Sequence, residues 1–420
     1  EIFPEDILAD LAAFLQRVHK PLAVRSSSLL EDSQYHPFAG VYETYMLPNN
    51  QSNPLIRLND LLSTIKRVYA STFYQAAKNY IKITSYRLEE EKMAVIIQRM
   101  VGSKHENRFY PNFSGVAKSY NFYPLSPQKA TDGIVSAALG LGKWVVDGGL
   151  TVRFCPKFPT DLIQFYSSRD SLENSQGEVY ALRLDETARF VETTHDTLVE
   201  TFGLSTAEKD GTLNYLGSTY SHDNDMIYEG LSRQGARLVT FTPILKNKIF
   251  PLSSILELLL DMGTWGMGTP VEIEFAVDLN QPKGQPAVFN LLQIRPIVDN
   301  REAIEAHLED VKESDTLIYS HSALGNGIIR DIHDFVYVKP ESFNPAVNKE
   351  TALKVGELND RFLADKKNYV LVGPGRWGSS DPWLGIPVKW PQISAARVII
   401  ESGLEHYRID PSQGTHFFQN

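Results

Sequence analysis

Residues 270–297, PVEIEFAVDLNQPKGQPAVFNLLQIRPI, carry the pattern from which the architecture of this chain is inferred. Residues 271–279 and 287–294 are rich in β-branched and aromatic side chains, which are typical of strands. Residues 280–286 between them contain the prolines and the glycine of a connection. The stretch therefore predicts two strands joined by a turn, and a hairpin if the two strands pair.

One face of this predicted hairpin is polar. Successive residues of a strand face opposite sides, so Glu272 lies beside Glu274, and the same parity puts Gln293 beside Arg295. Carboxylate and amide oxygens suit Mg²⁺, which proteins hold with one or two groups plus substrate phosphates, and the arginine fork suits phosphate. The alternative is a solvated face with a cross-strand ion pair. The hairpin alone favours that alternative.

A second polar group follows a short strand predicted at residues 21–25. The strand ends in Arg25, and a loop rich in serine and acidic residues leads from it toward Thr44. An arginine followed by hydroxyl and N–H donors provides what a polyphosphate needs. The alternative is a solvated loop whose serines cap a turn.

Composition limits the class of protein. The chain has 420 residues, enough for two or three domains, with 42% hydrophobic and 22% charged residues. The net charge of −10 argues against nucleic acid or an anionic membrane as the main partner. A single cysteine, Cys155, excludes an intrachain disulfide, and no apolar run reaches the roughly 18 residues of a membrane helix. We therefore expect a soluble, cytoplasmic protein, and we expect the stretch from Glu1 to Asn420 to be a piece of a longer chain.

Apolar periodicity predicts several further elements in the first 300 residues. Spacings of three and four indicate helices over residues 5–19, 58–80 and 253–262. Residues 93–101 are predicted to be a buried strand, with residues 113–120 as its neighbour in a sheet. Together with the hairpin, these elements predict that the first 300 residues contain both helices and strands.

The chain changes character after the hairpin. Residues 301–315 predict a charged connector, and residues 316–420 predict a separate, smaller α/β module. Its predicted elements are strands near 316–320, 334–339 and 369–372 and a helix over 350–366.

A glycine motif in this second module resembles a dinucleotide fingerprint. Residues Gly373 to Gly378 match G-x-G-x-x-G and follow a predicted strand. The fingerprint must open a helix, and Pro382 and Pro387 forbid one directly afterwards. We therefore reject a Rossmann site and keep an anion-binding loop around Arg376 as an alternative.

Short motifs across residues 20–298 resemble one family of nucleotide-binding domains. In chain order they are Arg25-Ser-Ser, Glu31-Asp32, Phe38-Ala-Gly40, Glu43-Thr44, Gln98-Arg-Met-Val, Ser114-Gly-Val, Gly140-Leu-Gly, Glu272-Ile-Glu274 and Gln293-Ile-Arg295-Pro. They are similar to the nucleotide-binding domain of phosphoenolpyruvate synthase and pyruvate phosphate dikinase, which rifampin phosphotransferases and glucan water dikinases share. The resemblance implies an ATP-grasp fold, with ATP and Mg²⁺ held between two α+β lobes.

The resemblance also implies roles for particular residues. The two catalytic arginines would be Arg25, which grips phosphates, and Arg295, which stabilises the phosphoryl group in transfer. The metal ligands would be Glu274 and Gln293. The remaining cofactor-binding positions would be Gly40 and Thr44 along the nucleotide, Gln98 near the base, and Glu272 as the first acid of its motif.

Three departures from the family pattern bear on function. The family's early Gly-Lys-Gly segment, whose lysine also holds phosphate, is absent from this sequence, and upstream of Glu1 is where we would look for it. The first acid of the acidic motif is usually Asp, whereas this chain has Glu272. No phosphohistidine loop or phosphoenolpyruvate barrel follows the motifs; His321 is the one histidine we consider as a carrier, with a structural or surface role as the alternative.

Two functional interpretations follow. The first is a Mg²⁺-dependent, ATP-binding phosphotransferase domain of the dikinase type, which transfers phosphoryl from ATP to a histidine or other acceptor outside residues 20–298. The second is a non-catalytic nucleotide-sensing module that regulates or scaffolds a partner through residues 316–420.

Overall fold

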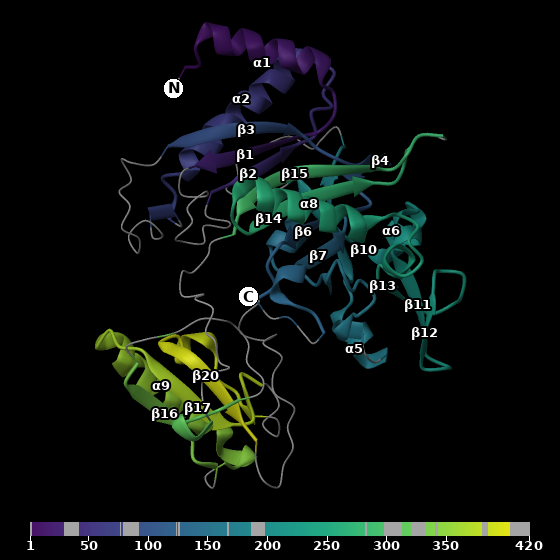
Figure 1. Ribbon diagram of the computed structural model, residues 1–420. Helices are drawn as coiled ribbons and strands as arrows, with labels where there is room; N and C mark the ends of the chain where they lie inside the picture. Colours follow the sequence, from purple (N-terminus) through teal and green to yellow (C-terminus); the bar gives the residue numbers. More distant parts are fainter. Residues whose placement is uncertain are drawn as a thin grey trace. The chain divides into compact units, whose positions relative to one another are not determined.

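The computed structural model divides the chain into two compact units, Glu1–Asn300 and Arg301–Asn420 (Figure 1). Gly40, Glu31, Asp32 and His321, which carry sequence predictions, lie outside the residues that the structure describes. The described residues are 2–28, 42–75, 77–78, 92–122, 124, 127–165, 168–185, 198–281, 284–297, 313–320, 329, 332–340, 343–379 and 385–403. Within them, no helix combines the length and the apolarity needed to cross a membrane.

The first unit begins with two helices packed on a three-stranded antiparallel sheet (Figure 1). The helices are α1 (Glu5–Arg17) and α2 (Pro54–Ser71), and the sheet has the order β2 (Thr44–Leu47), β1 (Leu22–Ser28), β3 (Met93–Arg99). In β1, Leu22 and Val24 are buried against the helices, whereas Arg25 lies on the opposite face. The alternation of the sequence thus leaves one face of this sheet available for polar contacts.

The partner predicted for residues 93–101 is wrong. β3 pairs with β1, and it is not fully buried, because the side chain of Ile96 is 43% exposed. A short hairpin of β4 (Ser103–His105) and β5 (Arg108–Tyr110) follows and carries the chain to another sheet. Gly102 allows the turn into this hairpin: its φ is 141°, and a Cβ there would lie 2.5 Å from the carbonyl carbon of Tyr110. Closeness in sequence therefore did not determine which strands pair.

The predicted hairpin of residues 270–297 is confirmed. β14 (Val271–Asp278) and β15 (Val288–Pro296) pair antiparallel, with Glu272 opposite Arg295 and Glu274 opposite Gln293. A β-bulge follows, because Phe275 pairs with Leu291 and Leu292 is left as one extra residue.

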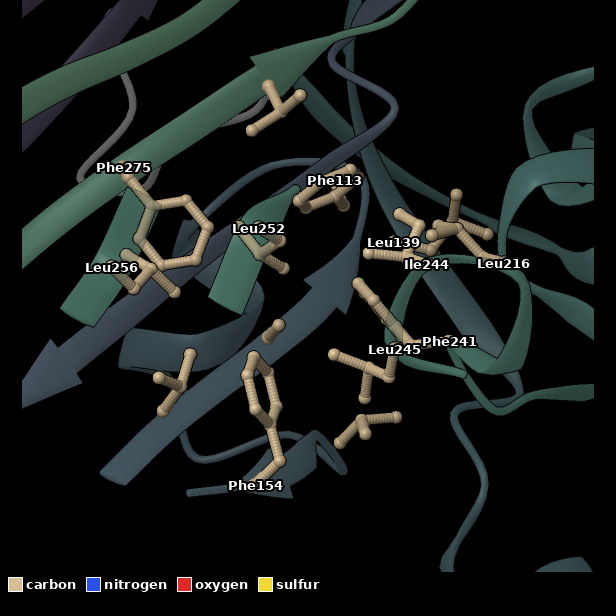
Figure 2. Packing of buried hydrophobic residues seen from close by; sticks show 14 of the residues in the cluster. Phe113, Leu139, Phe154, Leu216, Phe241, Ile244, Leu245, Leu252, Leu256 and Phe275 are labelled. Atoms are coloured by element: carbon tan, nitrogen blue, oxygen red, sulfur yellow. The ribbon is translucent and has the colours of Figure 1, made fainter. Parts of the chain in front are cut away.

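The hairpin belongs to a five-stranded antiparallel sheet with a large apolar core. The sheet order is β15, β14, β6 (Phe113–Lys118), β7 (Ile134–Leu139), β8 (Val152–Phe154). Helix α8 (Leu252–Met267) packs on this sheet, and it is longer than the helix predicted over 253–262. Figure 2 shows Leu252 and Leu256 of α8 beside Phe275 and Phe113. The ring of Phe275 packs directly over Gly115. A Cβ atom at Gly115 would lie 2.5 Å from that ring, so this position has no room for a side chain.

Further short elements occur among the described residues of the first unit. A four-stranded sheet has the order β10 (Val199–Gly203), β9 (Glu178–Arg183), β5, β4, and a three-stranded sheet has the order β12 (Met226–Glu229), β11 (Gly217–Ser221), β13 (Ala236–Val239). The short helices are η2 (Ala130–Asp132), α4 (Lys143–Val146), η3 (Ile163–Phe165), α5 (Ser168–Asn174), α6 (Leu204–Lys209), η4 (Thr212–Tyr215) and α7 (Thr242–Leu245).

The second unit contains a parallel three-stranded sheet covered by one long helix. The sheet has the order β16 (Asp334–Tyr337), β17 (Tyr369–Pro374), β20 (Ala396–Ser402), and α9 (Asn348–Ala364) crosses between β16 and β17. Its described residues also include three short helices, η6 (Glu313–Asp315), η8 (Pro345–Val347) and η9 (Trp390–Gln392). The strands predicted near 334–339 and 369–372 and the helix over 350–366 are therefore confirmed.

The strand predicted over residues 316–320 is wrong. These residues form no strand, and Leu317 is 83% exposed and Ile318 46% exposed. A strand needs its apolar side chains to pack against a core, and these two do not. The apolar, β-type composition of the stretch was therefore not enough to make it a strand.

The glycine motif of the second unit does not open a helix. β17 ends at Pro374, and Arg376–Trp377 forms a short strand, β18, that pairs with β19 (Gly385–Ile386). Trp377 is 1% exposed, and its backbone N–H donates to the carboxylate of Glu401 at 3.0 Å. The rejection of a Rossmann fingerprint at this motif is therefore confirmed.

Candidate functional site

The polar face of the β14–β15 hairpin is the candidate site. β14 lies between β6 and β15, so its residues 272–277 have a cross-strand neighbour on both sides. We call Lys118, Glu272 and Arg295 the Glu272 row, and Val116, Glu274 and Gln293 the Glu274 row. The register of the three strands brings the members of each row side by side.

In the Glu272 row, one carboxylate is held between two cations. Lys118 Nζ lies 3.1 Å from Glu272 Oε2, and Arg295 Nε donates to Oε1 at 2.8 Å. The side chain of Glu272 is only 11% exposed. Burial raises the pKa of Glu272, but the charges of Lys118 and Arg295 outweigh burial and hold the pKa below its ordinary value. Glu272 is therefore a fixed carboxylate at neutral pH.

In the Glu274 row, the partner comes from a different sheet. Arg25 of β1 donates from Nη1 to Glu274 Oε2 at 3.2 Å, and its Nη2 donates to Gln293 Oε1. The side chains of Arg25 and Glu274 are 21% and 20% exposed. One guanidinium thus joins the amino-terminal sheet to the hairpin through the two predicted metal ligands.

Two more predicted residues lie near this contact. Thr44 is opposite Arg25 in the β1–β2 register, so the two side chains share a face, and Thr44 is exposed. Gln98 of β3 donates from Nε2 to the carbonyl oxygen of Leu292 at 3.3 Å. The seven described residues of the predicted set therefore gather on two facing sheet surfaces; the eighth, Gly40, lies outside the described residues.

Sequence reasoning missed Lys118. Its side chain lies in the Glu272 row because β6 pairs with β14, and that pairing joins segments far apart in the chain. The parity of residues 113–118 was readable from the sequence, but the partner of that strand was not. This lysine is the one charged group of the two rows that was not predicted.

The Glu274 row fits a divalent cation shared with phosphate. Glu274 and Gln293 offer one carboxylate and one amide oxygen, and both bind the same guanidinium, so the two oxygens are close together. Hard oxygen donors of this kind suit Mg²⁺, which takes its remaining ligands from phosphate and water. No cluster of three His, Cys, Asp or Glu residues suited to a metal ion occurs in the described part of the chain. The donor set therefore fits a nucleotide-bound ion better than a cage made by the protein alone.

A cavity of about 590 Å³ opens at the other end of β14. Its lining includes Lys20, Gly102, Lys104 and Asp278. Asp278 has the same parity in β14 as Glu274, so the strand face that carries the two rows extends to the cavity, with the buried Ala276 between Glu274 and Asp278. The two rows and a cavity of ligand size thus lie on one strand face, with Glu274 and Asp278 about 13 Å apart along the strand.

A comparison with protein families finds one match. The family described as "Pyruvate phosphate dikinase, AMP/ATP-binding domain" matches residues 1–316. The match includes both rows, Arg25 and the cavity.

Three curated relatives share part of the chain. The uncharacterized phosphotransferase YvkC of Bacillus subtilis (strain 168) is 31% identical over 137 residues, which are 33% of this chain and 14% of that protein. Rifampicin phosphotransferase of Bacillus cereus (strain ATCC 14579) is 29% identical over 147 residues, 34% of this chain and 15% of that protein. Phosphoenolpyruvate synthase of Aeropyrum pernix is 30% identical over 131 residues, 31% of this chain and 14% of that protein. The similarity thus spans only a small part of each of these relatives.

Proposed function

The chain belongs to the family of the pyruvate phosphate dikinase AMP/ATP-binding domain, and we propose that its first unit binds ATP with Mg²⁺ and transfers a phosphoryl group from it. One observation carries the proposal: Arg25 of the amino-terminal sheet reaches Glu274 and Gln293 of the hairpin, with Arg295 in the next row. In this proposal the fold is ATP-grasp-like, and the two facing sheets are its lobes.

The two rows provide the charges that phosphoryl transfer requires. Its transition state is loose and spreads negative charge over the phosphoryl oxygens, so catalysis is mostly positioning and electrostatic stabilisation. Arg25 would grip the phosphates, and Arg295 would face the phosphoryl group in transfer. Glu274 and Gln293 would hold Mg²⁺, which supplies further positive charge at the phosphates when it is bound.

The rest of the nucleotide would extend along the same strand face. Gln98 contacts the hairpin at Leu292, between the rows and the cavity lined by Gly102 and Asp278. Thr44 would contact the nucleotide beside Arg25. We place the base toward the cavity and the phosphates at the two rows.

The acceptor of the phosphoryl group is part of the proposal. The relatives are named phosphotransferases and phosphoenolpyruvate synthase, and each is matched over 15% of its length or less. We propose an acceptor outside the first unit, either a histidine-bearing domain or a small molecule.

Calorimetry of ATP binding, with and without Mg²⁺, tests this proposal. We expect Arg25→Ala and Glu274→Gln each to weaken Mg²⁺-dependent ATP binding by about 10- to 100-fold, since each removes a charge-assisted contact worth roughly 1.5–3 kcal/mol. Arg237→Ala is the matched control, because Arg237 also forms a half-buried ion pair, with Glu208 at 2.7 Å, outside the candidate site. Unchanged affinity in both site variants would refute the assignment of the site.

A second candidate function is nucleotide sensing without turnover. The second unit has its own apolar core and lies mostly beyond the matched residues 1–316, which favours a regulatory or scaffolding role for it. ATP binding at the two rows without any ATP consumption, even with candidate acceptors added, would support sensing; ATP consumption would support phosphotransfer.

A further inference from the structure

We propose that Lys118 is a phosphate-binding residue of this site and that Glu272 is the positioning residue that holds it there. This inference rests on the proposed function, because it assigns a further contact to the same ATP. Lys118 is the last residue of β6 and lies directly opposite Glu272 in the β6–β14 register. Its ammonium group therefore stands at the edge of the polar face, next to the Glu274 row.

Burial differs sharply within the Glu272 row. Glu272 is 11% exposed, whereas the side chain of Lys118 is 42% exposed. A lysine ammonium has three N–H donors, and the contact with Glu272 Oε2 at 3.1 Å engages one of them. Lys118 is thus anchored at one side and open to solvent at the other, which is the arrangement of a cation that receives a ligand.

Charge supports the same reading. Lys118 and Arg295 place two positive charges around the single carboxylate of Glu272, so this row carries a net positive charge on a chain whose formal net charge is −10. A local positive charge on an acidic protein selects anions at that place. A lysine binds phosphate as a compact point charge, and an arginine binds it through its planar fork. The row therefore offers both kinds of phosphate contact side by side.

A structural role for Lys118 alone is the alternative, and the chain contains a matched ion pair with which to test it. Lys157 Nζ lies 3.1 Å from Asp132 Oδ1, and its side chain is 58% exposed while that of Asp132 is 7% exposed. The distance and the contrast in burial are close to those of Lys118 and Glu272. Lys157 lies outside the candidate site, so a merely structural contribution should be similar for both lysines.

The first test compares Lys118→Met with Lys157→Met in the full chain by calorimetry with ATP, ADP and AMP, each with Mg²⁺. We expect Lys118→Met to weaken ATP binding about 10- to 100-fold and AMP binding less than about 2-fold, and Lys157→Met to change neither. Lys118→Arg should retain most of the ATP affinity, because it keeps the charge.

A second measurement uses the unmodified protein and so does not depend on the folding of a variant. Acetylation of lysines by a mild reagent, read by mass spectrometry, should slow at Lys118 when ATP and Mg²⁺ are present, and should not slow at Lys157. AMP should protect Lys118 much less than ATP.

The outcomes separate the two proposals. If the wild-type protein binds ATP but Lys118→Met binds it equally well and ATP gives no protection, the inference about Lys118 is overturned and the proposed function stands. If the wild-type protein binds no ATP, both are overturned.

Discussion

Two carboxylates stand two residues apart on one strand face, and their surroundings differ. Glu272 is held by Lys118 and Arg295, both from its own sheet. Glu274 is held by Arg25, from a different sheet. The first arrangement follows from strand register alone, whereas the second depends on contact between two sheets.

This difference indicates which side-chain contacts of the site are permanent and which could be replaced by contacts with a ligand. The Glu272 row keeps its contacts as long as the five-stranded sheet is intact. In the Glu274 row, movement of Arg25 toward a ligand would release one carboxylate and one amide oxygen together. We infer that the first row positions charge and that the second accepts the metal.

The largest effect is expected for Arg295→Ala. If Arg295 faces the phosphoryl group in transfer, its loss should lower the rate of ATP turnover by about 10³-fold or more. Steady-state turnover with saturating Mg²⁺ and ATP measures this effect. Arg295→Lys keeps a charge beside Glu272 and serves as the control for folding; a rate for Arg295→Ala near that of the wild type would contradict the role.

A smaller effect on stability should distinguish the two carboxylates. Glu272→Gln removes a buried charge that faces two cations, and we expect it to lower the free energy of unfolding by about 1–2 kcal/mol. Glu274→Gln keeps an oxygen for Arg25 in a more exposed pair, so we expect a loss under about 0.5 kcal/mol. Urea unfolding of both variants makes the comparison. Equal losses would mean that the two rows do not differ as described.

Thr44→Val should have a still smaller effect, confined to nucleotide binding. Thr44 shares a face with Arg25, and loss of one neutral hydrogen bond to the nucleotide should weaken ATP binding by about 2- to 10-fold. Calorimetry with ATP and Mg²⁺ measures it, and Thr44→Ser is the control that retains the hydroxyl. No difference between the valine and serine variants would remove Thr44 from the site.

The smallest effect is expected in the second unit. Arg376 is the charged residue within the glycine motif, and we expect Arg376→Ala to change the affinity for ATP by less than about 2-fold, since the candidate site lies in the first unit. The same calorimetric assay applies. A loss of 10-fold or more would show that the second unit takes part in binding nucleotide.

The sequence predicted features that depend on neighbouring residues, but not the pairing of strands far apart in the chain. The hairpin and the faces of Glu272 and Glu274 were predictable because alternation is a property of neighbouring residues. The contact of Lys118 with Glu272, and the pairing of β3 with β1, were not, because they join strands far apart in the chain. The role of Arg25 came from motif order, and only the structure shows that it bonds Glu274.

In the second unit, too, a prediction from a local rule was correct and a prediction that depended on burial was wrong. The glycine motif at Gly373 was rejected correctly because proline excludes a helix, a local rule. The strand predicted over residues 316–320 failed because apolar composition does not determine burial, which depends on what the rest of the fold leaves uncovered.

The bulge at Leu292 has a consequence for how β15 tolerates change. Phe289 and Gln293 are four residues apart, so in an unbroken strand they would face the same side. Instead, Phe289 stacks on Phe275 in the core, while Gln293 bonds Arg25 on the opposite side. The extra residue shifts the alternation of side chains by one position. On one side of the bulge Phe289 faces the core, and on the other side Gln293 faces the candidate site. Substitution of Leu292 should therefore be mild, whereas its deletion would force β15 to lose either the stacking of Phe289 on Phe275 or the hydrogen bond of Gln293 with Arg25.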